Sequence, residues 1–191
     1  MSTQPKTFLT PEEYLEIERQ AEFKSEYYNG EMFAISGGSP KHNIITLNVS
    51  TALWAQLRHK ACLVFSSDVR LRVLPSGLYT YPEVMVVCGE PRYADDEKDT
   101  LVNPVVIVEV LSKSTRNYDR GEKFEFYREL TSVREYVTIA QHKPRLEQWT
   151  RQDQSHWLLT EFNEFDQSVH LASIDCVLEL SEIYFKVDWA A

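Results

Sequence analysis

Two apolar runs in this 191-residue chain each contain a single carboxylate. The runs are Tyr81-Pro-Glu-Val-Met-Val-Val-Cys-Gly89 and Asn103-Pro-Val-Val-Ile-Val-Glu-Val-Leu-Ser112. Their length and their content of β-branched residues are typical of buried strands. A buried carboxylate without a partner destabilises a fold by several kcal/mol, so Glu83 and Glu109 each require a compensating charge.

Strand geometry relates the two carboxylates. If the two strands are neighbours, Glu83 and Glu109 lie within one or two strand spacings of ~4.8 Å. Carboxylates at that distance repel each other unless a cation neutralises them. Mg²⁺ (or Mn²⁺) suits the pair, because Mg²⁺ takes oxygen ligands and needs only one or two carboxylates. Such an ion polarises a phosphoryl oxygen and activates bound water, so the pattern predicts metal-assisted hydrolysis.

The other patterns predict one domain of the α+β (or α/β) class over residues 1–191, with a central mixed sheet. Thr10-Pro-Glu-Glu13 begins a short helix with a capping box, and Ser39-Pro40 begins a helix of about 18 residues. Residues 24–35 form a hairpin with an Asn-Gly turn, in which Glu26 lies opposite Phe33. Further strands are expected at 62–65, 68–74, 81–89, 103–112, 135–140, 145–150, 156–162, 169–171 and 177–180, with helices at about 118–130 and from 181.

The net charge of −9, from 20 basic and 29 acidic residues, argues against a protein that coats nucleic acid by bulk electrostatics. A local basic groove remains compatible with this charge, because only the surface that faces the phosphates must be positive. Lys113, Arg116 and Arg120 follow the second apolar run and are the candidates for phosphate contacts; the alternative is a solvated rim. The acidic connection 90–103 is expected to be a solvated loop rather than a metal site.

The cysteines and the apolar segments indicate a cytoplasmic protein. Cys62, Cys88 and Cys176 are far apart and have apolar neighbours, which predicts buried thiols in a reducing compartment. No apolar run approaches the length that spans a membrane, and the first residues do not resemble a signal peptide. We therefore expect no membrane partner. A homodimer is compatible with the sequence, which does not specify an oligomeric state.

These residues carry a family resemblance. Pro82-Glu83, then Glu109 in an apolar strand and Lys123 in the following helix, resembles the PD-(D/E)XK nuclease superfamily. More narrowly, the two apolar runs and Asp119-x3-Lys123-x3-Tyr127 are similar to the bacterial Uma-two family of restriction-endonuclease-like proteins. Glu26-x3-Gly30-Glu31 and Ser39-Pro-Lys-His42 also fit that family, so the resemblance covers roughly residues 8–187. It implies a restriction-endonuclease-like αβββαβ core with additional C-terminal strands, and metal-dependent cleavage of phosphodiester bonds, with DNA as the expected substrate.

Two positions depart from the family pattern. The usual first-strand Asp is Glu83, and the usual lysine two residues after the second-strand acid is Leu111. Because leucine cannot hold water or phosphate, we expect Lys123 to supply the missing charge, with Lys113 as the rival. The resulting hypothesis assigns the metal to Glu83 and Glu109, the catalytic cation to Lys123, and a further catalytic or outer carboxylate to Glu26. His42 and Tyr127 are possible accessory residues.

Each assignment has a simpler alternative. Glu109 could pair with a buried basic residue, Glu83 could be a half-exposed structural carboxylate, and Glu26 could be only a cross-strand partner. His42 could cap its helix or satisfy the core, and Lys123 could form an intrahelical ion pair with Asp119. For the whole chain, the rival function is a binding module for nucleic acid or a protein partner that keeps the fold with a decayed site. A structural or partner-binding protein that uses the β-rich segment 145–180 is a third interpretation.

Overall fold

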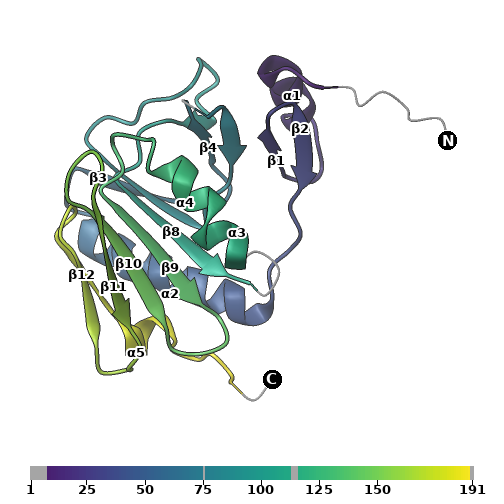
Figure 1. The fold of residues 1–191 in the computed structure, drawn as a ribbon. Helices are drawn as coiled ribbons and strands as arrows, with labels where there is room; N and C mark the ends of the chain where they lie inside the picture. Colours follow the sequence, from purple (N-terminus) through teal and green to yellow (C-terminus); the bar gives the residue numbers. More distant parts are fainter. Residues whose placement is uncertain (1–7, 75, 113–115, 190–191) are drawn as a thin grey trace.

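The computed structural model describes residues 8–74, 76–112 and 116–189, with the side chains of 116 and 117 left out. Its centre is a mixed six-stranded sheet with helices on both faces (Figure 1). In spatial order the strands are β11 (Trp157–Phe162), β10 (Leu146–Arg151), β9 (Glu135–Ala140), β8 (Val106–Leu111), β6 (Val84–Cys88) and β3 (Cys62–Ser66). Only the β8–β9 pair is parallel among these ladders, so the predicted mixed α+β class is confirmed.

Two smaller sheets complete the β structure. The first has the order β2 (Glu31–Ala34), β1 (Ser25–Tyr28), β5 (Leu78–Thr80), β4 (Arg70–Val73) and β7 (Thr100–Leu101). The second is the antiparallel pair β12 (Ser168–Leu171) and β13 (Cys176–Glu179), followed by α5 (Leu180–Ile183). The five-stranded sheet matters for the site, because it brings the N-terminal hairpin β1–β2 next to residues that follow β5.

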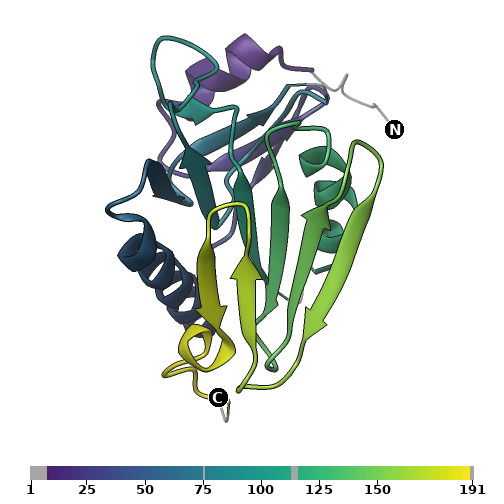
Figure 2. The same ribbon diagram turned by 90° about the vertical axis from the view of Figure 1, so that its left-hand side faces the viewer.

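Helix α2 (Pro40–Leu57) covers one face of the six-stranded sheet, together with β12, β13 and α5 (Figure 2). Its start is fixed by Ser39, whose Oγ accepts a hydrogen bond of 3.2 Å from the His42 backbone N–H. The predicted apolar stripe is fully buried, in the order Ile45, Val49, Leu53 and Leu57. The sequence prediction for this helix is therefore confirmed, including the position of His42 in its first turn.

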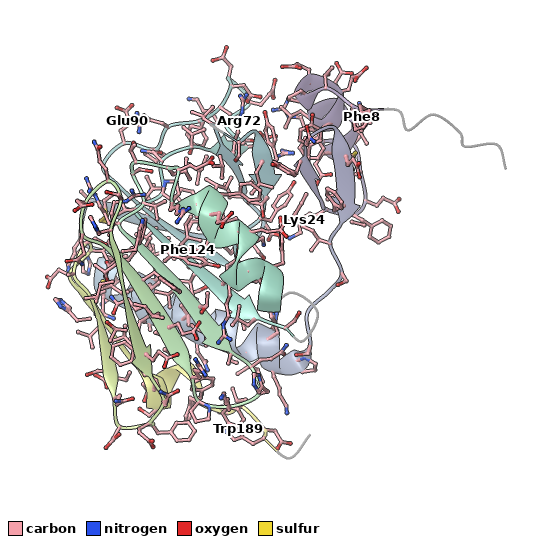
Figure 3. All side chains as sticks on the ribbon, viewed as in Figure 1. Phe8, Lys24, Arg72, Glu90, Phe124 and Trp189 are labelled. Carbon is pink, nitrogen blue, oxygen red and sulfur yellow. A yellow bond between two sulfur atoms is a disulfide. The ribbon has the colours of Figure 1, made fainter. Side chains whose placement is uncertain are left out.

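The opposite face of the sheet carries α3 (Arg116–Arg120) and α4 (Glu122–Tyr127) (Figure 1). Phe124 and Tyr127 pack there against Tyr136 of β9, and Phe124 is seen on the sheet side of α4 in Figure 3. The predicted single helix over 118–130 is wrong in its bounds. The backbone of Gly121, with φ −104° and ψ −93°, interrupts the helical path between α3 and α4.

The N-terminal elements match their sequence signals. Helix α1 (Pro11–Glu18) begins with the predicted capping box, in which Thr10 and Glu13 exchange hydrogen bonds of 2.8 and 3.2 Å. In the hairpin, Asn29 and Gly30 both have positive φ, at 49° and 85°, as a type I′ turn requires. The register pairs Glu26 with Phe33, so both side chains lie on the same face of the hairpin.

The acidic connection 90–103 is more ordered than predicted. Thr100 and Leu101 form β7 alongside β4, and this part of the connection is not a solvated loop. Asp99 accepts from Arg19 at 2.8 Å and from Arg70 at 2.9 Å, and Asp95 lies 2.6 Å from Arg19. These contacts tie the end of α1 to the five-stranded sheet.

The cysteine prediction is wrong for two of the three residues. Cys62 and Cys88 are directly opposite each other in the β3–β6 ladder, with Cα atoms 4.0 Å apart, and form a disulfide. Their separation of 26 residues in sequence gives no sign of this register. Cys176 is a buried free thiol, as predicted. Across the described ranges, no helix combines the length and the apolar character needed to cross a membrane.

Candidate active site

Strand β8 places a carboxylate in the interior of the sheet. All six residues of β8 are buried, and Glu109 is only 4% exposed. Because side chains alternate, Val108 and Val110 enter the α2 side of the core, whereas Glu109 faces α4 together with Ile107. There, the Tyr127 hydroxyl donates to Glu109 Oε1 at 2.7 Å.

Lys123 is the centre of a cluster of carboxylates that come from different elements. Its Nζ lies 3.1 Å from Glu26 Oε1 of β1, 3.2 Å from Glu109 Oε1 of β8 and 3.5 Å from Asp119 Oδ1 of α3. The hydroxyl of Thr80 donates to the same Glu26 oxygen. Lys123 is 7% exposed, so little water screens these contacts. The predicted pair with Asp119 exists, but it joins α3 to α4 instead of lying within one helix, and it is one of three.

Glu83 lies at the edge of the same site. The β6–β8 ladder pairs Val84 with Val108, and one further step along it would set Glu83 opposite Glu109. The strand itself begins at Val84 rather than at Tyr81, because Pro82 offers no backbone N–H to a ladder and Glu83 lies in a bend. Its carboxylate Oε1 is 3.1 Å from Nε2 of His42 at the start of α2.

The electrostatics follow from burial and from an excess of negative charge. Burial raises the pKa of Glu109 to about 7, and the charges of Asp119 and Glu83 add to this shift. Lys123 and the Tyr127 hydroxyl oppose it. Burial alone would lower the pKa of Lys123, but the charges of its three carboxylate neighbours hold that pKa well above its ordinary value.

His42 responds to the same field. Burial lowers its pKa, but the hydrogen bond to Glu83 and the charges of Glu83 and Glu109 outweigh burial, so the pKa is raised overall. Four carboxylates therefore face one ammonium and one imidazole. Even when His42 and Lys123 are both positively charged, the carboxylates give the site a net negative charge.

These side chains line a pocket with a volume of about 300 Å³. Its walls include the four residues that carry negative charge, Glu26, Glu83, Glu109 and Asp119, and the two bases His42 and Lys123. Hard oxygen donors with surplus negative charge fit Mg²⁺, which one or two carboxylates can hold. Within the described residues, no three His, Cys, Asp or Glu side chains are already arranged as a metal site. The donor chemistry of the pocket fits the ion. One carboxylate oxygen of Glu109 faces Lys123, and one of Glu83 faces His42.

The predicted phosphate-binding residues are a different case. Lys113 and the side chain of Arg116 lie outside the described part of the chain. Arg120 is described, and its Nη2 lies 2.8 Å from Oε1 of the buried Glu147 rather than at the pocket wall. Leu111 is 2% exposed and carries no charge to the site. Among the residues that the structure describes, Lys123 is the lysine that reaches Glu109.

The sequence analysis missed several members of the site. Asp119 was considered as part of the Asp119-x3-Lys123-x3-Tyr127 pattern and as an ion-pair partner of Lys123, but not as a residue that lines the pocket. Thr80 follows no pattern that points to a site. Phe33, Tyr81 and Tyr118 also line the pocket, and in the sequence they look like ordinary apolar positions.

Known proteins resemble this chain in sequence and in fold. Residues 11–181 match the sequence profile of a family described as "Uma2: putative restriction endonuclease". The chain belongs to the Uma2 family. The resemblance inferred from the motifs is thereby confirmed, and it extends across nearly the full length of this Uma2 chain.

Two relatives of this Uma2 chain come from Synechocystis sp. The uncharacterized protein sll1609 is 40% identical over 153 residues, which cover 80% of this chain and 86% of the relative. The uncharacterized protein slr1290 is 33% identical over 178 residues, which cover 92% and 91%. A crystal structure of "a putative nuclease belonging to DUF820" from Anabaena variabilis aligns with a TM-score of 0.75 and 16% identity, over 92% of this chain and 97% of that one. At this identity the match shows that the Uma2 chain shares that protein's fold.

Proposed function

We propose that this protein is a metal-dependent endonuclease that hydrolyses phosphodiester bonds in DNA. The observation that carries the proposal is Glu109, a carboxylate buried in a central strand and held by Lys123 and Tyr127 at the wall of a pocket. The description of the Uma2 family, "putative restriction endonuclease", supports the same reaction class. We also propose that the protein is cytoplasmic. In that compartment, thiol reductants would keep Cys62 and Cys88 as two separate thiols.

Glu83 and Glu109 would hold Mg²⁺ (or Mn²⁺), since the strand register brings these two acids to the same end of neighbouring strands. When bound, the ion supplies charge neutralisation at the phosphoryl group and a more acidic water. His42 fixes one oxygen of Glu83, and Tyr127 fixes one oxygen of Glu109. Because Tyr127 is fully buried, its role is to position the carboxylate rather than to touch the substrate.

Lys123 supplies a fixed positive charge. In the hydrolysis, a water oxygen forms a bond to phosphorus, the bond to the ester oxygen breaks, and the leaving oxygen takes up a proton. Negative charge grows on the phosphate oxygens during this step, and a cation that is already held in place stabilises it more than a mobile one. Glu26 and Asp119 hold the ammonium of Lys123 from two sides. Glu26 is thus a supporting carboxylate that comes from the hairpin.

The cleavage test compares two buried glutamates on the same face of the sheet. Thr138 pairs with Glu109 on one side and with Glu147 on the other, but Glu147 lies outside the pocket. We expect wild type to nick a supercoiled plasmid with Mg²⁺ and to lose this activity with EDTA. Glu109→Gln should lower the rate at least a hundredfold, because it removes a charged ligand while keeping the shape.

Glu147→Gln is the matched control and should keep the wild-type rate. Calorimetry with Mn²⁺ should detect binding to wild type and to the control, and no binding to Glu109→Gln. If wild type binds plasmid without cutting it under any divalent metal, the protein is the non-catalytic binding module instead. If both variants lose activity equally, the role given to Glu109 is wrong.

A further inference from the structure

The pocket has an aromatic rim beside its acidic floor. Phe33 stands directly opposite Glu26 in the β1–β2 ladder, so the two side chains leave the hairpin on the same face, about 5 Å apart at their Cβ atoms. The carboxylate of Glu26 reaches inward to Lys123, whereas the ring of Phe33 lines the outer part of the pocket and stays 48% exposed. Tyr81 and Tyr118 line the pocket from other elements.

The two tyrosine rings are held in place by the protein. The Tyr81 hydroxyl donates to Glu18 at 2.8 Å, and the charged groups of Lys24 and Arg70 lie over its ring. The ammonium of Lys123 lies 5.7 Å from the centre of the Tyr118 ring. Within the described ranges, no other aromatic ring stacks on Phe33, and no charged group lies over its ring as one does over Tyr81 and Tyr118. Phe33 therefore combines a place in the pocket lining with ring surface that remains exposed.

We propose that this rim binds an unpaired nucleobase stacked on Phe33, so that the nuclease acts on single-stranded nucleic acid or on unpaired nucleotides. The proposal rests on the proposed function and names its substrate class. Aromatic side chains bind single strands in this way, because every base has a π-face that can stack. A base inside a duplex has both faces covered by its neighbours and cannot use the rim unless it leaves the stack.

The charge of the protein favours the same substrate. With a net charge of −9 and four carboxylates around the pocket, phosphate attraction alone gives little affinity. Stacking needs no positive surface, so it can supply affinity where ion pairs cannot. Ile35, two residues after Phe33, also lines the pocket and is 37% exposed, which extends the apolar rim just past the end of β2.

The test uses a fluorescein-labelled oligothymidylate, the matching oligouridylate and a blunt duplex of the thymidylate, with Ca²⁺ in place of Mg²⁺. We expect wild type to bind at least one single strand more tightly than the duplex. Phe33→Ala should weaken single-strand binding by roughly 5- to 150-fold, the range that one base–aromatic stack represents. Duplex binding should change little, and Phe33→Trp should restore the single-strand affinity.

Phe185→Ala is the control, since Phe185 is 56% exposed and does not line the pocket. Equal losses from Phe33→Ala and Phe185→Ala, unchanged binding of Phe33→Ala, or a preference for duplex would each overturn the proposal. Plasmid or oligonucleotide cleavage separates this result from the proposed function. Normal cleavage with normal binding by Phe33→Ala would refute the stacking alone, whereas lost binding with no cleavage by wild type would refute the nuclease and leave the stacking in place.

Discussion

At the scale of single residues, the site depends on one lysine that serves three acids. Glu26, Glu109 and Asp119 all lie within 3.5 Å of Lys123 Nζ. Each acid is supplied by a different element, so Lys123 also joins the hairpin, the central strand and α3. Lys123 therefore both stabilises the fold and supplies the positive charge of the site.

Lys123→Met tests this double role. The substitution keeps the volume of the side chain but leaves the buried carboxylates without their cation, which should reduce the free energy of unfolding by about 3–5 kcal/mol. Divalent metal should restore part of this loss, because it replaces the missing positive charge. We therefore expect Mn²⁺ to raise the melting temperature more in Lys123→Met than in wild type.

Lys60→Met is the matched control for that measurement. Lys60 pairs with Asp175, whose side chain is 87% exposed, and water screens such surface pairs strongly. We expect the control to lose less than about 1 kcal/mol and to gain nothing from Mn²⁺ beyond wild type. A Lys123→Met protein as stable as wild type without metal would show that the three acids are already neutralised in another way.

At the scale of elements, the β1–β2 hairpin links a turn signal to the site. Asn29-Gly30 fixes the register, and the register aims Glu26 and Phe33 into the pocket. Gly30 has φ +85°, and a Cβ there would come within 2.6 Å of the Phe8 ring, which lies beside the hairpin in Figure 3. The turn therefore excludes larger residues for two reasons, backbone conformation and space.

Gly30→Ala should destabilise the protein and also lower cleavage. Gly77→Ala is its matched control, because Gly77 has φ +74° but a Cβ there would meet nothing within 4 Å. Both substitutions carry the strain of a left-handed residue, about 1–2 kcal/mol. Thermal unfolding should show the larger loss for Gly30→Ala, and only this variant should cleave DNA more slowly. Equal cleavage by both variants would separate the turn from the site.

The elements that the sequence predicted well are those with strong local signals. Helix α2 has a Ser-Pro start and an apolar stripe of period 3.6, and the hairpin has its Asn-Gly turn. The short strand β7 was missed because it depends on pairing with the distant strand β4. The break at Gly121 was missed although a glycine inside a helical pattern is a local signal for one. In the site, Glu109 and Lys123 were predicted from apolar surroundings and helical spacing. Phe33 was predicted on the correct face of the hairpin, opposite Glu26, but nothing in the sequence predicted that this face borders a pocket.

At the scale of the whole molecule, the N-terminal elements are tied to the five-stranded sheet by a charge network around Asp99. Arg19 at the end of α1 and Arg70 on β4 both donate to this carboxylate. The hydrogen bonds from Arg19, followed by those from Thr100 and Arg70, lower the pKa of Asp99 despite partial burial. The network matters for function because the same N-terminal elements carry Glu26.

A carboxyl group whose pKa is lower in the folded protein than in the unfolded chain stabilises the fold when the pH is above its unfolded pKa. This stabilisation is lost as the pH falls towards the folded pKa. Asp99→Asn should therefore be less stable than wild type at pH 7, and the difference should shrink below about pH 4. The side chains of Asp99 and Arg19 are about a third exposed, so we expect a difference of about 1 kcal/mol or less. Urea unfolding at pH 7 and at pH 3 measures it. Asp96→Asn, in the same loop but exposed, should match wild type at both values.

The disulfide between Cys62 and Cys88 also changes the covalent connectivity of the chain. It closes residues 62–88 into a ring, which contains β3 and β6 of the large sheet and β4 and β5 of the smaller one. Glu83 lies inside this ring, whereas Glu109 and Lys123 lie outside it. A single backbone cut within the ring leaves one molecule as long as the sulfurs are joined, and two pieces once they are reduced. After such a cut, the redox state of this bond, at the end of β6 away from Glu83, decides whether the two pieces of chain stay covalently joined.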